Sequence, residues 1–198
     1  MSDRMALKIA IDLMHVPSQV RLLRSEPLPD GLLILLRIAA GDAEAERAAA
    51  ALMDRSRTVV RQAATFFIEQ ILFAPNADSY QVLGASPQAS AGELRRNVAL
   101  LLRWLHPDLD PRGERSIFIG RVTAAWNDLK TPERRAAYDA VRRDKRVDSR
   151  SAAKGGRTPW RRGNKRPFPG QGAPSVYTKE RGGFLRRALS VLFHMPQQ

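Results

Sequence analysis

The sequence predicts an all-α protein, and three observations support this fold class. Apolar residues recur at helical spacing in several segments, and residues that favour helix N-termini precede these segments. No stretch alternates apolar and polar residues as a half-buried strand would, and runs of β-branched residues are few. We therefore expect helices joined by short loops, with no sheet.

Residues 1–75 are expected to form a small helical unit. An apolar run at 32–38 lies between Pro29-Asp30 and Gly41, and Asp42 is placed to cap an alanine-rich helix over about 43–54. Ser56 is placed to cap the next helix, whose apolar residues at helical spacing are Val60, Ala64, Phe67, Ile71 and Leu72. No motif in this unit suggests chemistry, so we expect it to form a core with its own helices or against the next domain.

Residues 78–142 are expected to form a second helical domain built on an antiparallel helix hairpin. Ser90 and Glu93 match a capping box, in which each side chain satisfies a free backbone donor of the helix start. That helix must end near Leu105–His106, because Pro107 disfavours helical geometry in the residue before it. A polar loop leads to a second amphipathic helix over about 114–129, and a short connection makes two such helices pack antiparallel. A third helix is expected to begin at Thr131-Pro132-Glu133.

Four motifs lie in this second domain in a fixed order. It opens with Asp78-Ser-Tyr-Gln-Val-Leu-Gly84, and His106-Pro107-Asp108 follows the longer helix. Ala125-Trp-Asn-Asp-Leu129 lies in the next helix, and Pro132-Glu-Arg-Arg-Ala-Ala-Tyr-Asp139 closes the domain. In this order and spacing the segment resembles the J-domain of the DnaJ family. The chain is most similar to the minimal class of that family, without a zinc module or C-terminal client-binding domains.

The resemblance implies a co-chaperone that stimulates ATP hydrolysis by a DnaK-type chaperone and directs it to a client or site. ATP would bind the partner, so no cofactor is expected on this chain. In the family, the histidine-proline-aspartate loop contacts the partner ATPase, and basic residues on the preceding helix assist docking. The matching residues here are His106, Pro107 and Asp108 in the loop, with Arg95, Arg96 and Arg103 on the helix.

The sequence departs from the family at positions that are usually basic. Ala99 and Leu100 occupy two of them in the middle of the long helix, Trp104 a third, and Leu109 follows the tripeptide. Weaker electrostatic steering toward a generalist partner follows from this loss. Leu100 and Trp104 would contact a specialised partner, contact the N-terminal helices, or pack inside the domain. The first of these alternatives makes the chain an interaction module for one dedicated partner.

The positive charge is concentrated in the last quarter of the chain. The net charge is +13, of which residues 142–187 contribute +12 and the first 141 residues only +1. Residues 143–183 are rich in Arg, Gly, Pro and Ser, which is typical of a basic disordered linker. Arginine and interspersed aromatic side chains suit phosphate groups and bases. The residues expected to bind an anion are Arg157, Arg161, Arg162, Lys165 and Arg166.

This tail supports an alternative function, in which the chain is an anion-binding adaptor for nucleic acid or a membrane surface and the second domain is only a scaffold. A soluble linker with incidental charge is the other interpretation of the tail. A short amphipathic helix is expected at 184–195, too short to span a bilayer. It would lie on a membrane surface, dock on the helical core, or bind a partner through the apolar face of Phe184, Leu185, Leu189 and Leu192.

The composition argues against an enzyme. The absence of cysteine excludes disulfides, thiolate metal sites and a cysteine nucleophile. His15 and His194 have no metal ligand or base at useful spacing, and His106 with Asp108 offers too few ligands for a metal site. No glycine-rich phosphate loop is present. No signal-peptide pattern or apolar span occurs, so we expect a cytoplasmic protein, peripheral at a membrane surface if the terminal helix binds one.

Overall fold

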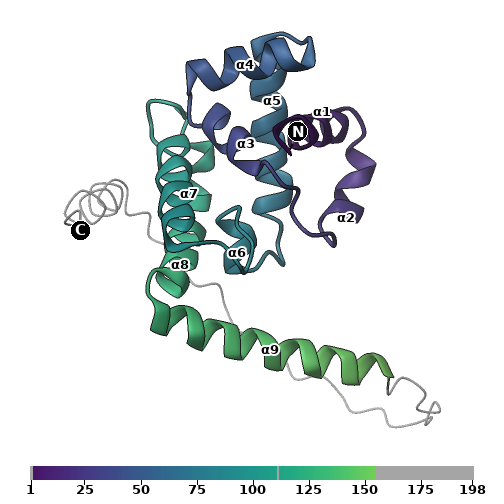
Figure 1. Cartoon of the computed structure of the whole chain (residues 1–198), viewed down its shortest axis with the longest axis vertical. Coiled ribbons are helices and arrows are strands. Elements are labelled where there is room, and N and C mark those ends of the chain that lie inside the picture. The colour runs from purple at the N-terminus through teal and green to yellow at the C-terminus, as the bar shows by residue number, and fades with distance from the viewer. Residues whose placement is uncertain (1, 111, 155–198) are drawn as a thin grey trace, which may run out of the picture. The chain divides into compact units, whose positions relative to one another are not determined.

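The computed structural model describes residues 2–110 and 112–154, with side chains up to residue 144. Every regular element in this part of the chain is helical, which confirms the all-α prediction (Figure 1). In order, the elements are α1 Ser2–His15, the 3-10 turn η1 Pro17–Gln19, α2 Val20–Leu23, α3 Leu32–Ala39, α4 Ala43–Met53, α5 Arg57–Phe67, the π-helical segment η2 Ile68–Leu72, α6 Ser79–Val82, α7 Ala91–Trp104, the 3-10 segment η3 Glu114–Phe118, α8 Ile119–Leu129 and α9 Pro132–Lys154.

The N-terminal helices pack around α5, which contacts α1, α3 and α4 (Figure 1). Both caps expected here are present. The Asp42 carboxylate accepts hydrogen bonds from the backbone N–H groups of Glu44 and Ala45, each at 3.1 Å, and the Ser56 hydroxyl accepts one from Val59 at 3.3 Å. The caps fix where α4 and α5 begin, and thereby which apolar residues face the core.

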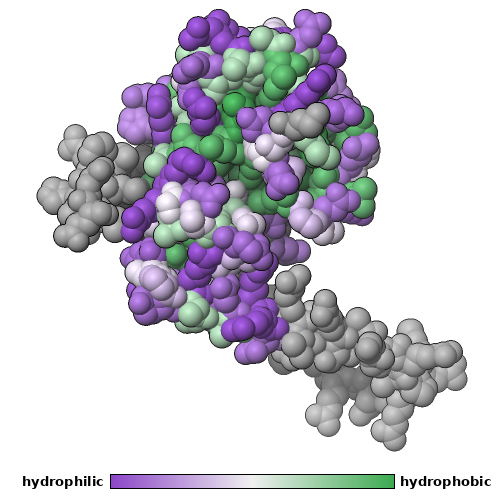
Figure 2. Space-filling model, in the orientation of Figure 1, coloured by the Kyte–Doolittle hydropathy of each residue, from purple (hydrophilic) through white to green (hydrophobic). Residues whose placement is uncertain are grey.

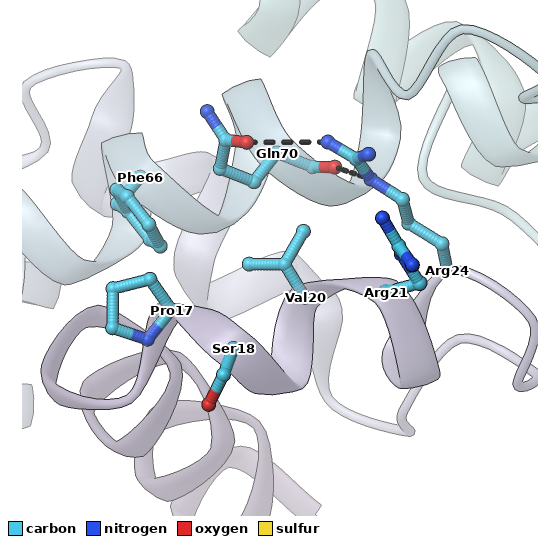
Figure 3. A pocket seen from close by; sticks show the side chains of 7 residues that line it. All are labelled: Pro17, Ser18, Val20, Arg21, Arg24, Phe66 and Gln70. Carbon is cyan, nitrogen blue, oxygen red and sulfur yellow. Dashed lines mark hydrogen bonds between the residues drawn. The ribbon is translucent and has the colours of Figure 1, made fainter.

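Two hydrogen bonds join the end of α2 to η2. The Arg24 guanidinium donates to the backbone carbonyl of Gln70 at 2.9 Å and to its side-chain oxygen at 3.2 Å. The carbonyl lies near the end of η2, where helical carbonyls lose their own donors, and Arg24 supplies one. The two residues line a surface hollow of about 610 Å³ whose apolar wall includes Val20 and Phe66 (Figure 3). The hydrogen-bonded pair of Arg24 and Gln70 therefore forms the polar wall of this hollow.

The second helical part contains the expected hairpin, with α7 and α8 packed side by side (Figure 1). The Ser90–Glu93 capping box opens α7, and the helix ends at Trp104 with Leu105 as its C-cap. Two boundaries differ from the prediction. The segment expected to start an α-helix at Glu114 is 3-10 up to Phe118, and α9 continues to Lys154, past the expected linker boundary at residue 143.

Both differences have local causes. Gly113 precedes η3 with a positive φ of 66° and offers no side-chain cap, so the first turn tightens before α8 begins. Between residues 142 and 154 there is no glycine or proline, and the first helix-breaking pair is Gly155-Gly156. Basic residues therefore continue the helix instead of ending it.

Residues up to Tyr138 form one compact unit, so the N-terminal helices and the hairpin share a core. The contact is made mainly by α3 against α7. Gly84 lies at this junction with a φ of +60°, and a β-carbon there would lie 2.9 Å from a Leu32 methyl group. The buried Asn97 amide donates to the carbonyls of Leu83 and Gly84, at 3.1 and 3.0 Å, which fixes the turn before α7.

On the face seen in Figure 2, apolar surface gathers over the N-terminal helices, while the surface over α8 is mostly polar. Met5 and Leu22 are among the exposed apolar side chains. No helix in the described ranges is long and apolar enough to cross a membrane.

Candidate functional site

The loop after α7 is a tight turn closed on one carbonyl. The backbone N–H groups of Leu109 and Asp110 both donate to the His106 carbonyl, at 2.9 and 3.1 Å. Pro107 sits at the outside of this turn, where its missing N–H costs no hydrogen bond. The sequence-predicted residues 106–108 are thus brought together at the tip of the α7–α8 hairpin.

The His106 and Asp108 side chains face each other across the turn. The imidazole Nδ1 lies 3.3 Å from the backbone nitrogen of Asp108 and 3.3 Å from its carboxylate Oδ2. The Asp108 side chain is 86% exposed and that of His106 is 39% exposed, so both are accessible to another molecule. Across the described ranges no cluster of metal-ligating side chains occurs, and this pair alone has too few ligands for a metal.

The three predicted docking arginines are all exposed on α7. Arg95 and Arg103 lie eight residues apart, on one stripe with the exposed Ala99, because residues four apart share a helix face. Their backbones are separated by about 12 Å along the helix axis. Arg103 lies in the last turn, next to the loop, and so extends the positive surface to residues 106–108.

The closing motif holds the opening motif in place. The Arg135 guanidinium donates to the Tyr80 hydroxyl at 2.9 Å and to the carbonyls of Ala89 and Pro87 at 2.8 and 2.6 Å. The Tyr138 hydroxyl accepts a hydrogen bond from the Ser79 backbone N–H at 2.8 Å. These long-range bonds join the start of α9 to α6 Ser79–Val82 and to the turn that precedes α7, so both motifs are structural.

The comparisons with known proteins agree with this geometry. The family model of the DnaJ domain matches residues 78–139, which is the segment that contains all four motifs and the loop. Residues 78–139 are a J-domain.

Relatives match over about a third of this chain. A chaperone protein DnaJ from Leifsonia xyli is 38% identical over 63 residues, which is 32% of this chain and 17% of the relative. A chaperone protein DnaJ from Tropheryma whipplei is 42% identical over 62 residues, 31% of this chain and 17% of the relative. A curved DNA-binding protein from Coxiella burnetii is 36% identical over 64 residues, 32% of this chain and 20% of the relative. The chain therefore spans at most a fifth of these relatives, and no solved structure matches it.

Trp104 does not lie on the surface of the J-domain. It is 1% exposed, and its ring stacks on Phe73 and Phe118, with centroids 5.9 and 6.3 Å away. Phe73 follows η2 in the N-terminal helices, so the stack joins them to the J-domain. The alternative in which Trp104 contacts a dedicated partner is wrong, because the ring is already buried within the compact unit. Leu100 is half-buried on the same helix.

Leu109 also faces the N-terminal helices. Its two terminal methyl groups lie 3.5 and 3.7 Å from the position of a β-carbon on Gly41, in the turn between α3 and α4. The residue after the tripeptide therefore lies beside this turn while remaining exposed to solvent.

Arg115 is the main residue of the site that the sequence reasoning missed. Its backbone N–H donates to the Asp110 carboxylate at 2.8 Å, and its guanidinium donates to the Leu109 carbonyl at 3.2 Å. The same guanidinium lies 4.9 Å from the Trp104 ring centroid and pairs with Glu69 at 3.5 Å. Burial raises the pKa of the Glu69 carboxyl, and the charge of Arg115 opposes that shift. No local motif marks Arg115, since its ion-pair partner Glu69 lies in a distant part of the sequence.

The predicted anion-binding residues Arg157, Arg161, Arg162, Lys165 and Arg166 lie outside the described residues. The same holds for the predicted amphipathic face of Phe184, Leu185, Leu189 and Leu192.

Proposed function

We propose that this chain is a co-chaperone whose J-domain stimulates ATP hydrolysis by a DnaK-type chaperone and directs it to a client or site. His106, Pro107 and Asp108 contact the partner ATPase, and Arg95, Arg96 and Arg103 assist docking. The carrying observation is the exposed turn of residues 106–108 within a segment that matches the DnaJ domain. The J-domain does no chemistry itself. It binds the hydrolysis-competent conformation of the ATPase more tightly than the resting one, and so shifts the population toward hydrolysis.

The arrangement of charge supports the docking part of this proposal. The exposed arginines of α7 form a positive surface that leads to the loop, and such a surface complements an acidic one on the partner. Exposed charges at the edge of an interface, such as these arginines, act mainly on the association rate, which falls as salt screens them. The loop then decides whether a bound partner hydrolyses ATP.

Single-turnover ATP hydrolysis by a DnaK-type chaperone tests the proposal. We expect the full chain to accelerate hydrolysis, and His106→Gln to abolish the acceleration while the protein stays folded by circular dichroism. His15→Gln is the matched control, because His15 is an exposed histidine of α1, away from the J-domain. A folded wild-type chain that leaves hydrolysis unchanged would refute the proposal and favour the anion-binding adaptor.

The docking arginines are tested by charge reversal. Arg95→Glu and Arg103→Glu should raise the concentration needed for half-maximal stimulation by roughly tenfold at low salt and by less at high salt. Arg57→Glu, at the exposed start of α5, is the matched control for net charge and should leave that concentration unchanged. Equal effects of all three variants would mean that only net charge matters.

A further inference from the structure

We infer that Arg115 is a positioning residue for the loop of residues 106–108, and that it fixes this loop against the N-terminal helices through Glu69 and Trp104. The inference rests on the proposed function for its activity readout and goes beyond it. It assigns to the N-terminal helices the task of holding the J-domain loop in the conformation that acts on the partner.

Arg115 holds the C-terminal side of the loop at two points. Its backbone N–H bonds to the Asp110 carboxylate, and its side chain bonds to the Leu109 carbonyl. Asp110 is only 8% exposed, so its carboxylate is not free to exchange this bond for water. The N-terminal side of the loop is already fixed, because Leu109 and Asp110 both donate to the His106 carbonyl. Together these bonds close the turn of residues 106–108 and fix Leu109 and Asp110, which form the base of this turn.

The same guanidinium anchors this base to the N-terminal helices. It pairs with Glu69 of η2 and lies over Trp104, which stacks on Phe73 just beyond η2. Only 24% of the Arg115 side chain is exposed, so water screens these contacts less than it would a surface pair. The Leu109 methyl groups also lie near Gly41 in the α3–α4 turn, but Leu109 stays exposed. The loop is thus joined to the N-terminal helices mainly through Arg115.

The geometry requires arginine at this position. A planar guanidinium can bond a carbonyl, pair with a carboxylate and lie over an aromatic ring at once, whereas a lysine ammonium is a point charge on a flexible stem. Arg115→Lys should therefore fail to restore what Arg115→Met removes. A residue that acted only through its charge would be rescued by lysine.

Arg121 offers a matched control. It is also a partly buried arginine between the J-domain and the N-terminal helices, where it donates to the carbonyls of Phe73 and Ala74 at 2.6 and 2.7 Å. Its bonds do not reach the loop. Arg121→Met should lower stability as much as Arg115→Met, or more, and leave the loop in place.

The test uses the full chain in the single-turnover assay, titrated until stimulation saturates. For Arg115→Met and Arg115→Lys we expect the maximal stimulation to fall by about tenfold, since a charge-assisted hydrogen bond to the loop is lost. The half-maximal concentration should change by less than about twofold, because the α7 arginines that set docking are untouched. A merely structural role would do the opposite. It would deplete the folded protein, raise the half-maximal concentration, and leave the maximum intact, as we expect for Arg121→Met.

Backbone amide hydrogen exchange separates this inference from the proposed function. The amides of Leu109 and Asp110 should exchange about tenfold faster in Arg115→Met than in Arg121→Met, whether or not the wild type stimulates a chaperone. Unchanged exchange, or wild-type maximal stimulation by Arg115→Met, would overturn the inference. If the wild type fails to stimulate while the exchange difference is present, the loop anchor stands and the proposed function fails.

Discussion

Replacing Trp104 with lysine would restore the kind of residue that the J-domain family usually has at this position, and the structure predicts that it would destabilise this protein severely. The ring is 1% exposed and stacks on Phe73 and Phe118. The Arg115 guanidinium lies 4.9 Å from the ring centroid. A lysine ammonium would be buried there beside an existing positive charge, without a carboxylate of its own.

The magnitude follows from the burial. Truncating a buried tryptophan costs about 3–5 kcal/mol, and a buried unpaired charge adds to that. Typical domains have about 5–15 kcal/mol of stability in total, so Trp104→Lys should remove most of it. Trp104→Phe should differ by less than about 1 kcal/mol. It keeps a ring in the stack, and it removes the indole N–H, a buried donor that has no partner.

Urea unfolding followed by far-ultraviolet circular dichroism measures both changes without depending on tryptophan fluorescence. Leu100→Lys is the control, because it places the same residue on the same helix at a half-buried position, and should cost about 1 kcal/mol or less. If Trp104→Lys were as stable as Leu100→Lys, Trp104 would not be buried in the aromatic stack. The N-terminal helices and the J-domain would then not share a core at this position.

Three further predictions concern other contacts. Burial raises the pKa of the Glu69 carboxyl above its ordinary value of 4.5, despite the charge of Arg115. The stability of the wild type relative to Glu69→Gln should therefore be highest below pH 4.5 and fall as the pH rises through the raised pKa. Urea unfolding at a series of pH values measures this difference. Ser90→Ala, which breaks the α7 capping box, should cost about 1 kcal/mol by the same method, with no change in pH dependence around neutrality. Gly84→Ala should lower the melting temperature by several degrees, since its β-carbon would meet a Leu32 methyl group at 2.9 Å and the backbone φ is positive; an unchanged melting temperature would contradict that contact.

Local features of the fold could be predicted because their causes lie within a few residues. Asp42, Ser56 and Ser90 each cap a helix that begins at the next residue, and each cap is a side chain bonding to a backbone group two or three residues ahead. The end of α7 follows from Pro107 in the same way, since proline restricts the residue before it. Residues 106–108 form a turn for that local reason as well.

The surroundings of the loop could not be predicted because their causes lie far apart in the chain. Arg115 reaches Glu69 from 46 positions away, and no spacing rule links an exposed-looking arginine in a polar loop to a glutamate in another helix. The burial of Trp104 depends on Phe73 in the same manner. The sequence identified Trp104 as a departure from the family and left open whether it packed inside, which only the tertiary contacts decide.

Two of the departures from the J-domain family lie on the side of the domain that faces the N-terminal helices. Trp104 and Leu109 replace basic residues. The Trp104 ring stacks on Phe73 of the N-terminal helices, and the Leu109 methyl groups lie near Gly41 in the turn between α3 and α4. A charged side chain in place of Trp104 would be desolvated by the same helices, so an apolar residue there is a condition of the shared core. Arg95 and Arg103 keep their charge on the face of α7 that remains exposed. At Trp104 the loss of positive charge coincides with the side of the J-domain that the N-terminal helices cover, whereas Ala99 lies exposed between Arg95 and Arg103 on the open face, and nothing in the structure explains its loss of charge.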